Sequence, residues 1–463
     1  MSRKFDVIVV GAGPAGMSSA IRLRTFGLSV LVVDEQPRPG GQLWRNIEGV
    51  AGSPLGQILG KEYESGASVA ADFRACGAVY EPDTQVWQLE PSWRVFLRRD
   101  GKTESVEARE IVLATGAQER PAPFPGWTLP GVMPVGGAQI LLKNARQIPE
   151  GPTWVVGSGP LPILYMAQVI RAGGTIEGWL DTSAPGEWRR TLPWLRAAFR
   201  GRKDILKGLV WLNQIKRSGT RRIRGVQSFR ALGEGRLQEL EYTLSSGVTR
   251  RVCVNALLVH EGVVPSVHVT RSLGLQHHWS HQQNCLVPTL DIWGRGSIAG
   301  ISVAGDGAGI GGGLAACARG EIAALGIAFR VGLLEQKKAD ALALPLRLRL
   351  ERLLGIRPML DALYPPPQHL VSPADETIVC RCEELTAGDI RKAAALASPG
   401  MNQLKAFTRA GMGPCQGRQC GYTIANIIAS EQKRQVTQQD FYRIRPPLKP
   451  VTLGEIISLR ADD

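Results

Sequence analysis

The sequence lacks the features that mark a nucleic-acid-binding or membrane-spanning protein. Its 463 residues carry a net charge of +14, yet Lys and Arg are scattered, and no basic run is interleaved with aromatic residues, which make up 6% of the chain. The longest apolar stretch near the middle, residues 322–334, is interrupted by Arg330 and falls short of the roughly 20 residues that a spanning helix needs. We therefore expect a basic surface that serves anionic cofactors or an acidic partner, with no nucleic acid and no transmembrane segment.

Other features that the sequence lacks narrow the class of protein further. Residues 1–10 run directly into an expected strand, which leaves no room for a signal peptide, so we expect a cytoplasmic protein. The eight cysteines are not spread like a disulfide framework, because four of them crowd into one C-terminal segment. No acid–base pair or Ser/His nucleophile can be recognised, so the catalytic residues stay unknown. The isolated cysteines are expected to be small, buried apolar residues: Cys76, Cys253, Cys285 and Cys317.

A glycine-rich turn stands near the N-terminus. Residues 5–16 predict a buried strand that turns into a helix reaching about Phe26. Glycines at such a turn allow a tight bend, the close approach of a pyrophosphate, and packing of the helix on the strand, and the pyrophosphate binds at the helix N-terminus. The residues of this turn that we expect to bind the cofactor are Gly11, Gly13, Pro14, Ala15 and Gly16.

An acidic residue follows the next expected strand, residues 28–33. Asp34 is the first choice as the acceptor for a ribose hydroxyl, and Glu35 is the alternative. Because strand, helix, second strand and acid follow one another in order, the segment predicts an adenine dinucleotide.

Three further segments favour FAD over NAD. A glycine pair suited to close passage beside a flavin follows the acidic residue and ends in Gly41, Gln42 and Leu43. A buried strand at residues 111–116 ends in Ala114, Thr115 and Gly116, and another at residues 301–306 ends in Gly305 and Asp306. With these segments the sequence resembles the glutathione reductase and thioredoxin reductase superfamily, α/β flavoproteins with two dinucleotide-binding domains.

The resemblance to this superfamily implies roles for individual residues. Its Ala-Thr-Gly turn marks the exit from the FAD domain, and its Gly-Asp carboxylate reaches the ribityl–phosphate region, which assigns these roles to Thr115, Gly116 and Asp306. Its thiol-disulfide reductases carry a redox cysteine pair, and none stands before Cys380, so thioredoxin reductase activity is not expected. His260 lies where the chain returns to the FAD domain. It is either a neighbour of the flavin or a satisfied core residue.

A second strand, turn and helix begin at Thr153, and a further strand, residues 175–180, ends at Asp181. In the superfamily this domain holds NAD(P)H, but here Pro162 occupies the third glycine position and no basic cluster for a 2′-phosphate follows. A working NAD(P)H site is therefore not expected. The alternatives are a retained scaffold domain or one that holds a different nucleotide.

Four cysteines form two close pairs in the C-terminal segment, in the spacing C-x-C and then C-x4-C: Cys380, Cys382, Cys415 and Cys420. Four thiolates suit either tetrahedral zinc or a [2Fe–2S] cluster. The segment resembles the bacterioferritin-associated-ferredoxin-like (BFD-like) [2Fe–2S] domain, whose commoner second pair is C-x2-C, and this departure keeps zinc open. The resemblance and the adjoining flavin favour [2Fe–2S].

The order of these motifs resembles, over nearly the whole chain, the A subunits of opine oxidases and hydroxyproline dehydrogenases, with hydrogen cyanide synthase and the α subunit of sarcosine oxidase as more distant relatives. This resemblance implies an electron-transfer subunit of a heteromeric dehydrogenase that oxidises the C–N bond of an amino acid or opine. It also implies a catalytic flavoprotein (β or B) subunit, in some members a further small subunit, an FMN at a subunit interface, and an electron acceptor. The alternatives are an NAD(P)H-dependent flavin/[2Fe–2S] reductase and a non-catalytic scaffold for a catalytic subunit.

The motifs also predict the domain limits. We expect a discontinuous FAD-binding domain at residues 1–120 and 265–330, and a second, degenerate nucleotide-binding domain at residues 121–264. A helical linker at residues 331–370 and a small helical [2Fe–2S] domain at residues 371–463 complete the chain.

Overall fold

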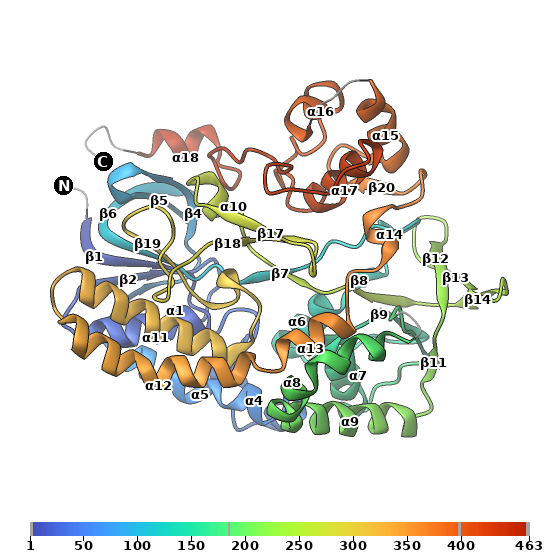
Figure 1. The fold of residues 1–463 in the computed structure, drawn as a ribbon, viewed down its shortest axis with the longest axis horizontal. Helices are drawn as coiled ribbons and strands as arrows, with labels where there is room; N and C mark the ends of the chain where they lie inside the picture. The colour runs from blue at the N-terminus through green and yellow to red at the C-terminus, as the bar shows by residue number, and fades with distance from the viewer. Residues whose placement is uncertain (1–2, 184–185, 397–399, 460–463) are drawn as a thin grey trace.

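A computed structural model describes residues 3–183, 186–396 and 400–459. The N-terminal sheet and the second, green-coloured sheet lie side by side, and the red-orange segment around residues 380–431 lies above the second sheet (Figure 1). Within the described residues, none of the helices is both long enough and apolar enough to cross a bilayer.

The first sheet has the strand order β3-β2-β1-β6-β5-β4, and a further strand, β19, pairs with β6. The pairs of β1 with β2 and with β6 are parallel, whereas β4, β5 and β6 run antiparallel. Residues 7–10 of β1 and all of β2 are buried, as expected for parallel strands covered on both faces. The strands are β1 (Arg3–Val10), β2 (Val30–Val33), β3 (Val79–Glu81), β4 (Gln85–Glu90), β5 (Arg94–Arg99), β6 (Lys102–Leu113) and β19 (Ile301–Val303).

Helix α1 (Pro14–Arg24) covers this sheet together with α11 (Gly313–Arg330), against which it packs closely. Gly320 makes this close contact possible, because a Cβ there would lie 2.2 Å from the Ala15 carbonyl oxygen. The other helices of the N-terminal part are α2 (Ile47–Val50), α3 (Pro54–Leu59), α4 (Lys61–Glu64) and α5 (Gly66–Ala75).

The second sheet is parallel, in the order β11-β10-β9-β15-β8. Its strands are β8 (Val132–Pro134), β9 (Thr153–Gly157), β10 (Gly178–Leu180), β11 (Arg221–Ile223) and β15 (Ala256–His260), and its helices are α6 (Val135–Ala145), α7 (Pro160–Arg171), α8 (Leu195–Arg200) and α9 (Arg202–Arg217). The expected strands at residues 28–33 and 175–180 are shorter than predicted, because they begin at Val30 and Gly178.

An antiparallel sheet of β12 (Val226–Leu232), β13 (Glu239–Leu244) and β14 (Thr249–Cys253) projects from the second sheet (Figure 1). Cys253 is exposed there, so the prediction that it is buried was wrong. Cys285 and Cys317 are buried, and Cys76 is half-buried. Cys253 ends an edge strand whose residues face solvent, a position that its isolated sequence context does not reveal.

Short strands carry the chain between the two sheets. Strand β7 (Ala117–Glu119) leaves the first sheet and pairs antiparallel with β16 (Val263–Pro265), which returns to it. The return continues through α10 (His268–Ser272), β17 (His277–Ser280) and β18 (Cys285–Pro288). The two crossings between the sheets, β7 on the way out and β16 on the way back, therefore run side by side.

The C-terminal part begins with the long helix α12 (Gln336–Leu354) at the lower left of Figure 1 and then runs upward past the second sheet. Its other helices are α13 (Arg357–Leu363), α14 (Gln368–Val371), α15 (Ala387–Ala395), α16 (Met401–Thr408), α17 (Gly421–Glu431) and α18 (Leu453–Ile457), and its strands are β20 (Ile378–Cys380) and β21 (Leu385–Thr386). One buried apolar cluster extends from Ile8 and Ile111 of the first sheet to Ile390 and Ile424 of this part. The cysteine-containing C-terminal part is therefore packed against the N-terminal sheet.

Candidate functional site

The glycine turn between β1 and α1 is packed too tightly for a side chain at Gly11 or Gly16. Gly11 has a φ of +104°, and a Cβ there would lie 2.5 Å from the Ala114 carbonyl oxygen. A Cβ on Gly16 would lie 1.8 Å from the Gly11 carbonyl oxygen. Helix α1 starts with Pro14 after Gly13, and no side chain caps its first N–H groups. These free donors and the helix dipole suit a pyrophosphate.

Of the two predicted ribose-binding acids, only Asp34 faces this turn. Its carboxylate accepts hydrogen bonds from the N–H of Ala12 at 2.5 Å and of Gln36 at 2.8 Å. Burial raises the pKa of Asp34, and the two backbone bonds oppose this. Glu35 is exposed and forms an ion pair with Lys449 of the C-terminal tail at 2.9 Å. The geometry thus favours Asp34 over Glu35 as the ribose acceptor.

The predicted glycine-pair loop lies directly on the glycine turn. Gly41 has a φ of +59°, and a Cβ there would lie 2.9 Å from the Cα of Gly13. The N–H of Gly40 donates to the Ala12 carbonyl at 2.8 Å. Gln42 and Leu43 follow at the surface, so the loop forms one wall of the same site.

A buried lysine under this loop was missed by the sequence reasoning. Lys143, on α6, donates from Nζ to the carbonyl oxygens of Gln42 and Leu43, each at 3.1 Å, and to Gln139 Oε1 at 2.9 Å. Burial lowers the pKa of Lys143 to about 7, and the charge of Arg45 lowers it further. A single Lys in an apolar helix carries no signal in the sequence, because its partners lie about 100 residues away.

The two remaining flavin motifs meet beside the glycine turn. The Ala304 N–H at the end of β19 donates to the Leu113 carbonyl of β6 at 3.0 Å, which aligns the Gly305-Asp306 turn with the Ala114-Thr115-Gly116 turn. The Asp306 carboxylate accepts from the N–H groups of Gly311 and Gly312 at 2.8 and 3.0 Å. Thr115 Oγ1 is buried and has no hydrogen-bond partner within the described chain. An orphaned donor at this turn fits a bound ligand.

The four C-terminal cysteines come together as two pairs, each joining one motif to the other. Cys380 lies close to Cys420, and Cys382 lies close to Cys415. Cys380 and Cys420 are buried, Cys415 is half-buried and Cys382 is exposed. The Cys420 thiol and the N–H groups of Gly411, Glu383 and Cys382 lower the pKa of Cys380 to about 6, although burial opposes them.

Local structure explains this arrangement. Cys420 caps α17, and Thr386 caps α15 through a capping box with Asp389, so both helices begin close to a cysteine motif. Gly413 lies so near Cys382 that a Cβ there would be 2.2 Å from the Cys382 Cβ. Among the residues that the structure describes, no three His, Cys, Asp or Glu side chains converge on a single-ion site. Two thiol pairs suit the two iron atoms of a [2Fe–2S] cluster, with two cysteines for each iron.

His260 is a satisfied residue that nevertheless lies close to the flavin motifs. Its Nδ1 is 2.6 Å from Glu119 Oε1, and the other Glu119 oxygen accepts from the Gly136 N–H at 2.7 Å. Glu119 belongs to β7, directly after the Ala-Thr-Gly turn. The pair therefore ties the end of β15 to the exit strand of the first sheet.

The second nucleotide fold has the expected strand, turn and helix, but the acid that follows its second strand already forms ion pairs. Asp181 is 1% exposed and forms ion pairs with Arg222 at 2.6 Å and Arg224 at 3.4 Å. Burial, and then the charge of Asp181, raise the pKa of Tyr364, so this linker residue lies beside the acid. Pro162 is buried in the first turn of α7. A ribose would have to displace these partners.

Two family models match the chain. The model for pyridine nucleotide-disulphide oxidoreductases matches residues 5–173, which include the glycine turn, Asp34 and the Ala-Thr-Gly turn. The model for the BFD-like [2Fe–2S] binding domain matches residues 378–430, which include all four clustered cysteines.

Curated relatives match over nearly the full length. The A subunit of opine oxidase from Rhizobium meliloti (strain 1021) is 40% identical over 98% of this chain and 99% of its own. The chain belongs to the opine oxidase A-subunit family. Hydrogen cyanide synthase subunit HcnB of Pseudomonas aeruginosa is 33% identical over 98% of both chains. The predicted FAD and [2Fe–2S] cofactors are confirmed for this family member.

The fold has a solved counterpart as well. L-proline dehydrogenase from P. horikoshii superimposes with a TM-score of 0.72 over 98% of this chain and 80% of that chain, at 18% identity. At this identity the similarity concerns the fold, and it confirms the predicted α/β architecture with two dinucleotide-binding domains.

Proposed function

We propose that this chain is the electron-transfer subunit of a heteromeric dehydrogenase that oxidises the C–N bond of an amino acid or opine. The observation that carries the proposal is the direct contact between the two cofactor motifs. Gln118, two residues beyond Gly116, donates to the carbonyl oxygen of Arg418, which lies between Cys415 and Cys420, at 3.2 Å. A flavin and a cluster held by these motifs would lie within one continuous packed region.

The cofactors divide the chemistry between a two-electron and a one-electron carrier. A flavin accepts an electron pair as a hydride when a CH–NH group is oxidised to C=N, whereas a [2Fe–2S] cluster passes single electrons. The protein's part is to fix the positions and environments of the two groups. Gly11, Gly13 and Asp34 would hold the FAD, and the four clustered cysteines would hold the iron.

The substrate is proposed to react on another subunit. The relatives with full-length matches are named as subunits, of opine oxidase and of hydrogen cyanide synthase. The partner that fits is a catalytic flavoprotein subunit, with an FMN at the interface and in some assemblies a further small subunit. In this chain, the buried acid Glu261 accepts from Thr182, and His260 is bound to Glu119, so both serve internal contacts.

The competing NAD(P)H-dependent reductase receives little support from the second fold. NAD needs a free acid for its ribose hydroxyls, and the ion pairs of Asp181 with Arg222 and Arg224 occupy that group. We therefore propose that the second domain is a scaffold with respect to NAD(P)H. We also propose the domain limits that the motifs predict.

Copurification tests the proposal. The tagged chain is purified anaerobically from its native host, and the associated proteins are identified by mass spectrometry. We expect a second flavoprotein, and we expect an octopine, nopaline or amino-acid substrate to bleach the flavin only when that protein is present. NADH should leave the flavin of the isolated chain oxidised.

Two results would contradict the proposal in different ways. Rapid bleaching by NADH in the isolated chain would favour the reductase. Full turnover by the isolated catalytic partner with an artificial dye, at the rate of the complex, would favour the non-catalytic scaffold.

A further inference from the structure

The cysteine cluster has one edge that faces solvent. Cys380 and Cys420 are buried on the inner side, whereas Cys382 is exposed. Beside it, Met412 is 52% exposed. Gly413 lets the backbone of the second motif lie directly against Cys382. A cluster held by these cysteines would therefore be nearest to solvent at Cys382 and Met412.

The segments around this edge are strongly basic. Residues 380–384 and 400–420 carry the cysteines, and residues 441–449 pack on them through Tyr442, whose ring lies against Gly411 and Gly417. The acids in these segments are Glu383 and Glu384. The cations are Arg381, Lys405, Arg409, Arg418, Arg443, Arg445 and Lys449.

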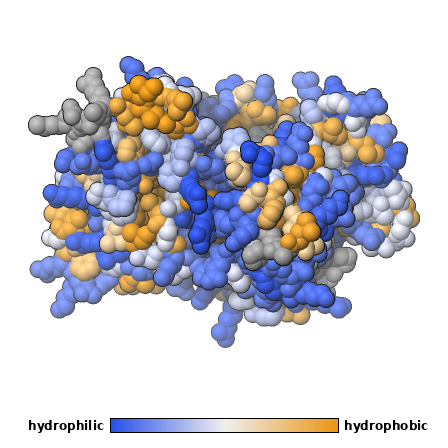
Figure 2. Space-filling view, turned by 90° about the horizontal axis from the view of Figure 1, so that it is seen from above, coloured by the Kyte–Doolittle hydropathy of each residue, from blue (hydrophilic) through white to orange (hydrophobic). Residues whose placement is uncertain are grey.

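Few of these cations are neutralised within the described chain. Arg409 binds Glu383 at 3.0 Å, and Lys449 binds Glu35. Arg443 and Arg445 are exposed, and no acidic partner lies within ion-pair distance of them in the part of the chain that the structure describes. Figure 2 views the molecule from above, the side on which α15 to α17 lie in Figure 1, and shows hydrophilic residues interspersed with hydrophobic patches on that face.

The cations also lie close to one another. Burial lowers the pKa of Lys405, and the charges of Arg445 and Arg443 lower it further. Lys405 lies over the ring of Tyr442 at 6.0 Å, so it joins the same rim. Like charges held together without counter-ions create a field that attracts an anionic partner.

We propose that the face of the C-terminal domain that carries Cys382 and the cations Lys405, Arg443 and Arg445 is the docking site for an acidic protein with a one-electron centre. This inference rests on the cluster assigned under the proposed function. A small apolar contact with a charged rim is typical of transient redox encounters, in which complementary charge raises the association rate. Each transfer moves one electron to one oxidised acceptor centre without a proton. Two transfers account for the electron pair taken from one C–N bond.

The test uses two forms of one acceptor. Horse cytochrome c is basic, and its succinylated form is acidic, while both carry one ferric haem that takes one electron. Binding to the oxidised holoprotein is measured by calorimetry at low ionic strength, and haem reduction by the anaerobically reduced holoprotein is measured by stopped flow. We expect tight binding and fast reduction for the succinylated form only, with both advantages disappearing as salt is added.

A pair of charge-reversal variants locates the site. Arg443→Glu with Arg445→Glu should weaken binding of the succinylated form and slow its reduction by about tenfold. The matched control is Lys203→Glu with Arg217→Glu on α9, which changes the net charge equally at the lower edge of Figure 1, whereas α15 to α17 lie at its upper edge. This control should leave both measurements within about twofold of the parent protein.

Three outcomes separate the inference from the proposal beneath it. Equal losses in both double variants would contradict the docking site, because they would report net charge alone. Equal behaviour of the two cytochrome forms in iron-replete protein would also contradict it, and would leave the cluster assignment standing. Purified protein without iron would overturn the cluster and the docking site together.

Discussion

Gln118 and Arg418 join the flavin motif to the cysteine motif through a single hydrogen bond. The Gln118 side chain leaves the exit strand of the first sheet and donates to the main-chain carbonyl oxygen of Arg418 at 3.2 Å. His268, at the return to the first sheet, lies with Nε2 3.2 Å from the Gln416 carbonyl oxygen. Both crossings between the sheets therefore contact the loop between Cys415 and Cys420.

Replacing Gln118 with Leu should loosen this loop. Leu is similar in size to Gln but has no donor, so the Arg418 carbonyl oxygen loses its hydrogen bond at a cost of about 1 kcal/mol. We expect faster amide hydrogen exchange in residues 415–420 and unchanged FAD content. Gln57→Leu on α3, away from the cysteines, is the control. Unchanged exchange in the Gln118 variant would show that the loop is held by other contacts.

Replacing Cys415 with Ser should remove the cluster while FAD stays bound. Cys415 is half-buried in a pair with Cys382, so its loss breaks one of the two thiol pairs. Visible absorption of the cluster and iron content are expected to fall to the background of the apo-protein. Cys253→Ser, an exposed cysteine of β14, should keep both. Full iron content in the Cys415 variant, or zinc in place of iron in the parent protein, would refute the ligand set.

The local parts of these sites could be predicted from the sequence. The glycine turn, the Ala-Thr-Gly turn and the cysteine spacing are each set by residues close together in the chain, where backbone geometry dictates the residue type. The contacts that join them could not be predicted. Lys143 reaches Gln42 across about 100 residues, and no single-residue pattern reports such a pairing.

The choice between Asp34 and Glu35 illustrates the same limit. Both follow the same strand, and periodicity treats them alike. The structure separates them because Lys449, from the other end of the chain, holds Glu35. His260 likewise became interpretable only when Glu119 was found 2.6 Å away.

Replacing Lys143 with Met should weaken both the fold and FAD retention. The carbonyl oxygens of Gln42 and Leu43 would lose a buried donor, which costs roughly 1–3 kcal/mol. The FAD-to-protein ratio after gel filtration should therefore fall, because the loop that carries these carbonyls lines the proposed flavin site. Lys203→Met on the exposed face of α9 is the control.

Lys143 should also make the stability of the protein depend on pH. Burial lowers the pKa of Lys143 from 10.5 to about 7, so between these values the unfolded chain binds a proton that the folded chain does not. The free energy of unfolding should then rise with pH across this window. The Lys143→Met protein lacks that contribution, and its stability curve should be flatter than that of the parent from pH 7 to 10. Parallel curves would show that the folded protein keeps Lys143 charged.

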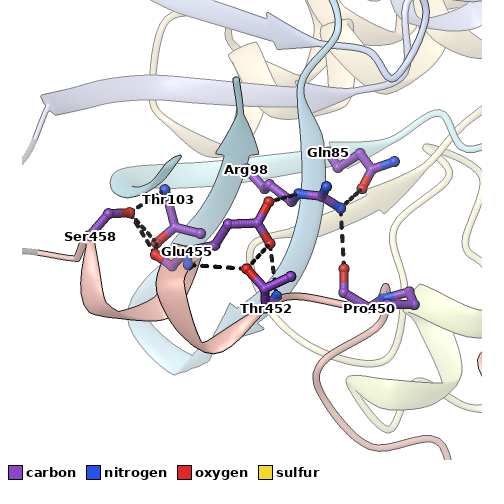
Figure 3. A network of polar contacts seen from close by, with 7 residues as sticks. All are labelled: Gln85, Arg98, Thr103, Pro450, Thr452, Glu455 and Ser458. Carbon is purple, nitrogen blue, oxygen red and sulfur yellow. Dashed lines mark hydrogen bonds and ion pairs between the residues drawn. The ribbon is translucent and has the colours of Figure 1, made fainter. Parts of the chain in front are cut away.

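The C-terminal helix α18 should detach when its polar anchor is removed. Figure 3 shows the anchor, in which Glu455 closes a capping box with Thr452 and also accepts from Arg98 Nε at 2.6 Å. Thr103 Oγ1 donates to the Glu455 carbonyl at 2.7 Å, and the Thr103 N–H donates to Ser458 Oγ at 2.8 Å. Thr103→Val keeps the shape but removes the first of these bonds, at a cost of about 1 kcal/mol.

The pH dependence of this anchor has the opposite sign to that of Lys143. The Thr452 N–H, the Thr452 hydroxyl and Arg98 lower the pKa of Glu455 below 4.5. Their stabilisation is fully present above pH 4.5 and is lost as pH falls through the lowered value. We expect proteolysis near residue 450 to accelerate in that acidic range, and Glu455→Gln to be cut readily already at pH 7. Because Lys449 lies just before the helix, the freed tail should also release its ion pair with Glu35. If Glu455→Gln resists the protease as well as the parent does, apolar packing holds the helix and not this network.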